Sequence, residues 1–299
     1  MWFGDQRYNK LIWKNDSKVD TLKQILINDM NISMRLLYSL KKEKGILVNN
    51  NFYKMHEIVK LGDIIEINLP DEKNDYKAED LNIKVLYEND DLLVVEKDPF
   101  IVVHPTKKHD NNTLANGLIK LFEDKKIKSK IRFVNRLDRD TSGILIIAKN
   151  GFCHSMLSKD DAMHDMKKKY YAIVKGYMKD EEGLIDLPIG HNEGDINRIV
   201  SEDGQRAVTR YKVIQKLKDA SLLEISLETG RTHQIRVHFA HIGHPLLGDE
   251  LYGGDMELFN RQALHCFELG FYSPRVKEMI RIKSELPQDM RELLSRLSE

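Results

Sequence analysis

Two aspartates, Asp138 and Asp140, alternate with two arginines, Arg136 and Arg139, directly before an apolar run at residues 144–148. Five apolar residues bounded by turn-forming residues predict a strand that is buried on both faces. Charge of this density beside a core is costly unless the groups pair, although most such runs are solvated loops with weak surface ion pairs. A carboxylate at the mouth of a buried strand can act as a nucleophile or as a proton acceptor.

A second group of candidate residues lies around Gly230, after a predicted strand. Gly230 permits a tight turn, and Thr229 or Thr232 is placed to cap the helix that follows. The apolar residues expected on the buried face of this helix are Ile235, Phe239 and Ile242. Because N–H groups at a helix amino terminus attract negative charge, Arg231 and Arg236 near this end favour an anion-binding site.

The sequence predicts neither a metal ion nor a cofactor. Four histidines follow the turn: His233, His238, His241 and His244. No nearby carboxylate stands at a helical spacing that would complete a zinc site. The chain also lacks a phosphate-cradling glycine loop, a dinucleotide fingerprint and a thiolate cluster. Its two cysteines, Cys153 and Cys266, are too isolated for a disulfide framework, and we expect both to be buried.

Composition and charge narrow the class of protein. The chain has 299 residues, of which 41% are hydrophobic and 31% are charged, so it can form a large core. Lys plus Arg, 47, equals Asp plus Glu, 47, so contact with a polyanion must depend on local patches. No apolar run could span a membrane and the amino terminus lacks a signal-peptide layout, so we expect a cytoplasmic protein, acting as a monomer.

The first 70 residues predict a small module that would present a basic edge. A helix begins near Asp20, and a second one, which Ser33 can cap, carries three lysines near its end. Strands are predicted at 46–48 and 64–69. The module resembles the alpha-L RNA-binding domain of ribosomal small-subunit protein four, although a helical cap with a solvated lysine edge would show the same pattern.

A polar stretch at residues 71–80 is almost free of apolar side chains, which is typical of a linker. We therefore expect two domains, residues 1–75 and residues 76–299. Further patterns predict a hairpin at 83–87 and 92–95, a helix at 113–122, and strands at 144–148, 167–176, 207–213 and 222–227. A stretch rich in Gly, Asp and Asn at residues 181–206 predicts a loop. The fold expected is α+β, a mixed and largely antiparallel sheet with surrounding helices.

The most basic run of the chain, residues 125–130, contains four lysines and leads into the charged loop. Lysine runs are usually solvated surface. Because this run directly precedes the candidate active-site loop, it is nevertheless well placed to guide the phosphate backbone of a nucleic acid.

Three signatures resemble, in this order, those of the RluA family of pseudouridine synthases, which convert chosen uridines of ribosomal or transfer RNA into pseudouridine. They are N-R-L-D-R-D-T-S-G-I-L-I-I-A-K at 135–149, K-x-Y-x-A at 168–172 and T-G-R-T-H-Q-I-R-V-H-F-A-H-I-G-H-P-L-L-G-D-x-L-Y-G at 229–253. With smaller matches around Lys97, His104 and Ala263, they cover nearly all of residues 81–287. Asn135 replaces a usual His, and Asp98-Pro99-Phe100 replaces a Pro-Ala-Gly type of turn.

The resemblance implies roles that fit the chemistry of the reaction. Cleaving a glycosidic bond needs a carboxylate beside the ribose, and a stacked uridine must be flipped out to be reached. Asp138 is the implied catalytic carboxylate, which attacks the sugar or the base, or takes the proton of the ribose 2-hydroxyl. Arg236 would pair with Asp138 and keep it ionised, with Arg231 as the second candidate. Tyr170 would stack on the uracil.

Further residues are implied around the flipped base. Arg136 resembles the arginine that fills the gap left in the RNA, and Ile235 or Leu264 would line the pocket. The alpha-L resemblance favours large-subunit ribosomal RNA over transfer RNA as the partner.

Two other functions fit parts of the sequence. One is an RNA-binding or ribosome-assembly protein without isomerase activity, against which the intact set of charged residues argues. The other is a hydrolase built on Ser142, but the chain lacks a G-x-S-x-G elbow, and Ser142 precedes a strand where that elbow would precede a helix.

Overall fold

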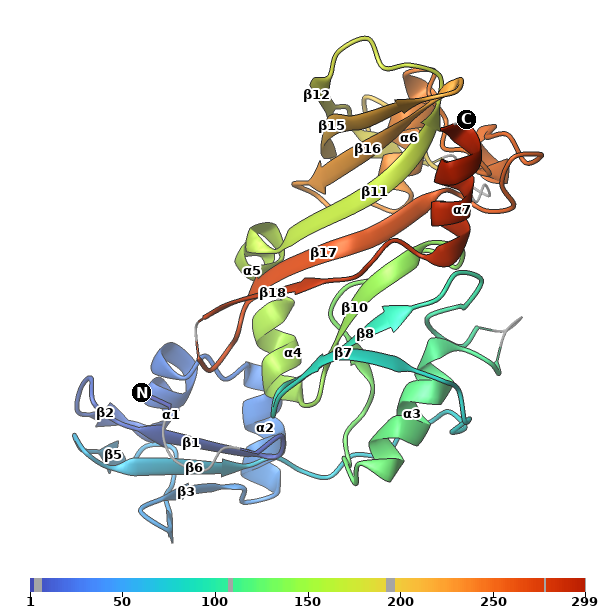
Figure 1. Cartoon of the computed structure of the whole chain (residues 1–299). Coiled ribbons are helices and arrows are strands. Elements are labelled where there is room, and N and C mark those ends of the chain that lie inside the picture. Colours follow the sequence, from blue (N-terminus) through green and yellow to red (C-terminus); the bar gives the residue numbers. More distant parts are fainter. Residues whose placement is uncertain (3–6, 107–109, 192–196, 277, 299) are drawn as a thin grey trace.

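The computed structural model describes residues 1–2, 7–106, 110–191, 197–276 and 278–298. Figure 1 shows two sheets of unequal size, with the amino-terminal one in blue. None of the helices in the described ranges is long and apolar enough to cross a membrane.

The first sheet is built from the amino-terminal residues and has the order β1-β6-β3-β4. Its strands are β1 (Lys10–Lys14), β6 (Ile64–Asn68), β3 (Ile46–Val48) and β4 (Asn51–Phe52), with β2 (Asp20–Thr21) and β5 (Ile58–Val59) paired beside them. Its helices are α1 (Leu22–Gln24), the π-helix η1 (Ile25–Asp29) and α2 (Met34–Lys42). The side chain of Ser33 caps α2 as predicted. Strand β1 was not predicted, because its alternation spans only five residues.

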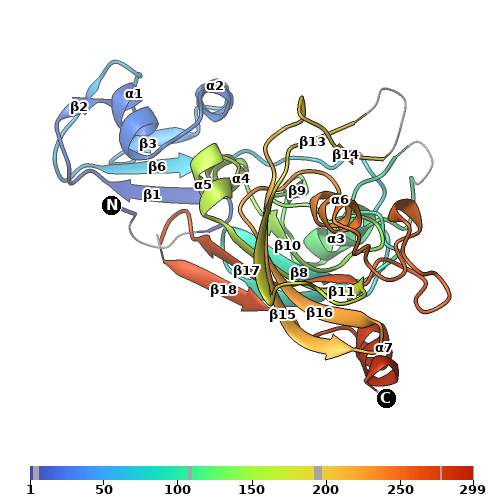
Figure 2. The same ribbon diagram turned by 90° about the horizontal axis from the view of Figure 1, so that it is seen from above.

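The second sheet has ten strands and is largely antiparallel, so the predicted α+β class is confirmed. Its path runs through β12 (Glu182–Asp186), β15 (Val208–Leu217), β16 (Ala220–Leu227), β11 (Lys167–Lys175), β17 (Leu264–Tyr272), β10 (Ser142–Ala148), β8 (Leu92–Lys97) and β7 (Lys84–Glu88), with β18 (Met279–Lys283) on β17 and β9 (Arg132–Phe133) on β10. The helices of this part are α3 (Leu114–Asp124), α4 (Gly151–Leu157), α5 (Asp160–Asp165), α6 (Gln234–His241), α7 (Gln288–Leu297) and the short 3-10 turn η2 (Glu250–Tyr252). Helix α6 and the pair β13 (Ile189–Gly190) and β14 (Ile199–Val200) lie on one face of this sheet (Figure 2).

Strand β10 is the buried strand that the sequence predicts, and every one of its residues is buried. It pairs in parallel with β17 and in antiparallel with β8. Gly143 has a φ of 123°, and a Cβ at this position would lie 2.3 Å from the carbonyl oxygen of Cys266, so only glycine lets β17 come this close. Asn135 fastens the preceding loop to β10: its Nδ2 donates to the Ile144 carbonyl, and its Oδ1 accepts from the Ile146 amide.

Three local predictions were wrong. Residues 181–206, predicted as a loop, contain β12 and the short strands β13 and β14, which lie at an edge or outside the main sheet and bury few side chains. Helix α6 begins after His233, which has a φ of 57° and makes no side-chain capping bond. The Thr229 hydroxyl instead accepts from the Val208 amide and donates to Gln234 Oε1. Ile242, expected on the buried face, follows the helix and is 36% exposed.

The polar stretch at residues 71–80 has no helix or strand, but it is bound to the neighbouring basic run. Lys128 pairs with Asp71 and Lys130 pairs with Asp75. Lys125, from the same run, pairs with Glu88. These lysines therefore pair with acids of their own chain, and their use as a guide for RNA phosphates stays a prediction. The division into domains at residue 75 stays a prediction.

Candidate active site

A cavity of about 860 Å³ opens between the loop before β10, strand β11 and the start of α6. Each site residue that the sequence suggested lies in its wall: Arg136, Asp138, Tyr170, Arg231, Ile235, Arg236 and Leu264. This volume is within the usual range for pockets that hold a small molecule or a nucleotide.

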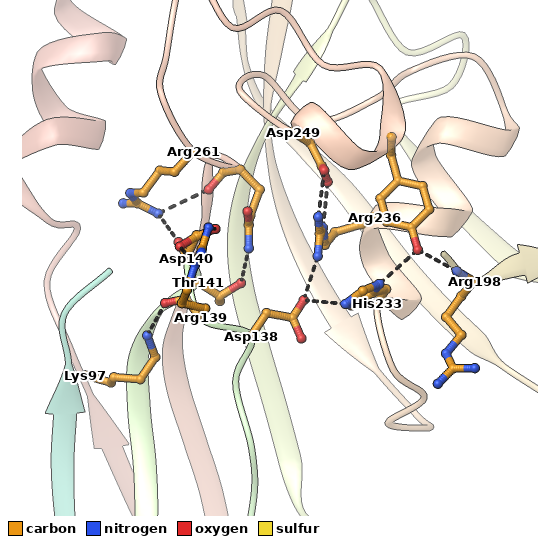
Figure 3. A network of polar contacts seen from close by, with 12 residues as sticks. Lys97, Asp138, Arg139, Asp140, Thr141, Arg198, His233, Arg236, Asp249 and Arg261 are labelled. Atoms are coloured by element: carbon orange, nitrogen blue, oxygen red, sulfur yellow. Dashed lines mark hydrogen bonds and ion pairs between the residues drawn. The ribbon is translucent and has the colours of Figure 1, made fainter. Parts of the chain in front are cut away.

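Asp138 lies at the mouth of β10 and keeps 21% of its side chain exposed. Its backbone carbonyl accepts from the Thr141 amide, which closes a turn before the strand. Its Oδ2 lies 3.1 Å from Nη1 of Arg236 and 3.8 Å from Nε2 of His233. The carboxylate is thus held from one side and remains open to the cavity on the other (Figure 3).

Arg236 joins two carboxylates. Its Nη1 donates to Asp138, while its Nε and Nη2 form a two-point pair with Asp249 at 2.7 and 2.8 Å. Asp249 is fully buried. Arg236 lies against Asp138, as the resemblance implies, but through a single N–H group, because its planar fork pairs with Asp249.

On the same side of Asp138, a hydrogen-bonded chain ends at His233, whose Nε2 lies 3.8 Å from the carboxylate. The backbone N–H of Arg198 donates to the Tyr252 hydroxyl at 2.8 Å, and this hydroxyl lies 2.9 Å from Nδ1 of His233. Burial raises the pKa of Tyr252 and lowers the pKa of His233, which favours a protonated phenol and a neutral imidazole. The phenol then donates to Nδ1, so the imidazole proton is on Nε2, the nitrogen that faces Asp138.

Two buried cations support the backbone of the same loop. Nζ of Lys97 donates to the carbonyls of Asp98, Ile101 and Arg139 at 2.7 to 3.1 Å. Burial lowers the pKa of Lys97 to about 7. Arg261 donates from Nη1 to the Asp140 carbonyl at 3.1 Å. These contacts to backbone carbonyls therefore fix the loop that carries Asp138 and do not involve the Asp138 carboxylate.

The other predicted residues differ in exposure. Tyr170, Ile235 and Leu264 are buried in the cavity wall, whereas Arg136 and Arg231 are exposed. Nε of Arg231 donates to the Arg206 carbonyl, so this residue, the second candidate partner of Asp138, points to a different group.

Three residues that take part in this network received no role from the sequence: His233, Asp249 and Tyr252. All three stand in the third signature, at 229–253, which is the signal that could have identified them. Their function depends on contacts with residues far away in the chain, which spacing alone does not give.

The serine proposed for a hydrolase is not accessible. Ser142 is 2% exposed and its Oγ lies 2.9 Å from Nδ1 of His265, itself fully buried. The other ring nitrogen of His265 faces the Ser284 hydroxyl at 3.2 Å, and burial lowers the pKa of His265 to about 4. A histidine held neutral inside a sheet and lacking a carboxylate partner is a structural residue, which argues against the hydrolase.

The histidines around α6 serve packing and hydrogen bonding. His238 is buried between the Thr209 hydroxyl and the Leu187 carbonyl, and His244 lies against the Lys175 carbonyl. Within the described part of the chain, no group of three or more His, Cys, Asp or Glu side chains is arranged to hold a metal ion.

The family model described as RNA pseudouridylate synthase matches residues 91–241. The uncharacterized RNA pseudouridine synthase YjbO of Bacillus subtilis is 40% identical over 270 residues, which cover 89% of this chain and 95% of the relative. The ribosomal large subunit pseudouridine synthase D of Zymomonas mobilis is 36% identical, covering 86% of this chain and 85% of the relative.

A solved structure shares the fold. The human RNA pseudouridylate synthase domain containing 1 aligns with a TM-score of 0.58 and 24% identity, covering 74% of this chain and 96% of that one.

Proposed function

The chain belongs to the RNA pseudouridylate synthase family, whose members are isomerases that act on RNA, and from this premise we propose that it converts specific uridines of large-subunit ribosomal RNA into pseudouridine. The choice of substrate is supported by relatives named ribosomal large subunit pseudouridine synthase D at 34 to 36% identity. The observation that carries the proposal is the contact of 3.1 Å between Asp138 and Arg236 in the wall of a cavity of nucleotide size.

Asp138 is the catalytic carboxylate of this reaction. A target uridine leaves the RNA stack and enters the cavity, because the reacting bond is otherwise inaccessible. The ring of Tyr170 stacks on the uracil, while Ile235 and Leu264 contact its apolar edge. Arg236 holds Asp138 ionised and directed at the ribose. The exposed Arg136 takes the place of the flipped base in the RNA, and Arg231, at the rim, contacts phosphate.

The amino-terminal residues contribute RNA affinity in this proposal. Helix α2 presents Lys41 and Lys42 at its exposed carboxyl end, and the ring of Tyr38 on the same helix is 71% exposed. Exposed cations bind phosphates and an exposed aromatic ring stacks on unpaired bases. We place the enzyme in the cytoplasm and propose that it acts as a monomer.

The test uses RNA from cells that lack the gene, labelled with tritium at uracil C5, because pseudouridine formation releases this hydrogen. The unaltered protein should release tritium, and Asp138→Asn should abolish the release while filter binding of the RNA is retained. Asn has nearly the size and polarity of Asp but cannot attack or accept a proton. No release by the unaltered protein, or normal release by Asp138→Asn, would refute the assignment.

Fractionating the RNA after the reaction then identifies the substrate. Release from large-subunit ribosomal RNA is expected. Release confined to transfer RNA would retain the chemistry and refute the proposed substrate.

A further inference from the structure

Lys168 is a buried cation in the wall of the cavity. It lies on β11, is 9% exposed, and lines the cavity together with Tyr170. The other two buried lysines are satisfied: Lys149 pairs with Glu88 at 2.7 Å, and Lys97 donates to three carbonyls. Over the ranges that the structure describes, no residue forms an ion pair or a hydrogen bond with the Lys168 ammonium group.

An ammonium group on a buried side chain is unfavourable without a counter-ion, and burial lowers the pKa of Lys168. A cation without a counter-ion in the wall of a cleft is a candidate functional group, because a bound ligand can supply the missing negative charge. The neighbouring turn leaves room for one. A Cβ at Gly230 would lie 3.6 Å from Nζ of Lys168, so the absent side chain keeps the space before the ammonium group open.

The position of Lys168 relative to Tyr170 defines what it can reach. The burial of β11 alternates so that residues 168, 170 and 172 face the same side. Residues two positions apart on a strand are separated by about 6.5 to 7 Å along it, and their side chains point to the same face. If the uracil stacks on Tyr170, as in the proposed function, the ammonium group lies beside the edge of the ring.

We propose that Lys168 is a catalytic residue whose ammonium group contacts the uracil oxygen that becomes negatively charged when uracil leaves the ribose. The inference rests on the proposed function. For attack at the ribose, an oxygen of Asp138 bonds to C1′ as the bond from C1′ to N1 breaks. The electron pair of that bond passes to the uracil and places negative charge on O2 and O4. Reattachment through C5 then displaces Asp138 and releases the C5 proton to solvent.

The distribution of cations in the cavity favours a uracil oxygen over a phosphate. Arg136 and Arg231 are exposed at the rim, where the charged backbone of the RNA can remain hydrated. Lys168 is buried on β11, two residues before Tyr170, on which the uracil is proposed to stack. A fixed cation in a desolvated site stabilises developing charge far more than it does in water.

The test compares Lys168→Met, which keeps the length of the side chain, with Lys169→Met on the opposite face of the strand, where Lys169 pairs with Glu224. Tritium release from RNA of cells lacking the gene gives kcat and KM, and filter binding gives affinity. Lys168→Met should lower kcat by about 100-fold or more, the usual effect of removing one group that stabilises transition-state charge. KM and affinity should be unchanged. Lys169→Met should behave like the unaltered enzyme.

Thermal unfolding separates catalysis from structure. Removing an unpaired buried charge should leave the Tm unchanged or raise it. A lower Tm together with lower activity would make Lys168 a structural residue and overturn the proposal, as would an unchanged kcat. A raised KM with normal kcat would assign the ammonium group to a phosphate and overturn it as well.

A second substrate tests the charge directly. Fluorine at C5 withdraws electrons and makes uracil a better leaving group, so 5-fluorouridine in the RNA needs less help from a cation. Under single-turnover conditions, the decrease in rate caused by Lys168→Met should be smaller for disappearance of 5-fluorouridine than for uridine. Equal decreases would contradict the inference. Absence of release by the unaltered enzyme would instead refute the proposed function, so the two failures are distinguishable.

Discussion

Replacing Arg236 by lysine tests how the two carboxylates share one guanidinium group. Arg236 donates twice to Asp249 and once to Asp138. A lysine retains the charge but lacks the planar fork, so it cannot satisfy both acids. Leaving a buried charge without its partner costs about 3 to 5 kcal/mol. Asp249 is fully buried whereas Asp138 is 21% exposed, so the lysine is expected to stay with Asp249 and release Asp138.

The magnitude follows from the hydrogen bond that the lysine cannot make. A hydrogen bond to a charged group contributes about 1.5 to 3 kcal/mol. If this bond orients Asp138 in the transition state, kcat should fall by about 10- to 150-fold. RNA affinity should change little, because Arg236 is buried and contacts acids of its own chain.

The assay is tritium release with Arg231→Lys as the matched control, because Arg231 lines the same cavity but donates to the Arg206 carbonyl. The control keeps the positive charge that contacts phosphate, so it should keep nearly full kcat. An unchanged kcat for Arg236→Lys would refute the reasoning, and a greater decrease in Arg231→Lys would transfer the role to Arg231.

Three further perturbations have definite outcomes. Tyr252→Phe keeps the ring against Arg236 but removes the hydroxyl that fixes the His233 tautomer, so kcat should fall by about tenfold, near 1.4 kcal/mol. In a protein that already carries His233→Gln, Tyr252→Phe should lower kcat no further, and additive decreases in the double variant would contradict a joint action of the two residues. Lys97 has a pKa of about 7 in the folded protein and 10.5 in the unfolded chain, so between these pH values the unfolded state binds more protons and the free energy of unfolding should rise with pH. Urea unfolding should show this increase in the unaltered protein and not in Lys97→Met. Replacing Lys41 and Lys42 together by alanine should weaken RNA binding, and the slope of log affinity against log salt concentration should fall by about 1 for each phosphate contact that is lost. An unchanged slope would show that this end of α2 is solvated surface that does not bind RNA.

The sequence by itself determined the features that depend on local pattern. The apolar run at 144–148 forms the last five residues of β10, because five consecutive buried side chains need a strand covered on both faces. Thr113 caps α3 and Ser33 caps α2, since a side-chain oxygen at these positions accepts an amide hydrogen of the first turn. The signatures at 135–149 and 229–253 likewise indicated the family that the comparisons show.

Some sequence patterns do not reveal the partners that distant residues provide. The lysines at 125–130 have the pattern of an RNA-binding run, and three of them pair with acids at 71, 75 and 88, so their use by RNA stays a prediction. The strands between residues 182 and 200 are short and mostly exposed, so they lack the apolar alternation by which a strand is recognised.

The geometry of the candidate site was decided only by the tertiary structure. Asp138 and Arg236 are 98 positions apart, and they meet because the order of strands in the ten-stranded sheet brings the mouth of β10 opposite the start of α6. That same packing places Asp249 against Arg236 and gives Lys168 no carboxylate partner among the residues that the structure describes. Residue types and their local spacing fix which groups can ionise or bond, but the partner of a buried charge is set by whichever distant segment the fold packs against it.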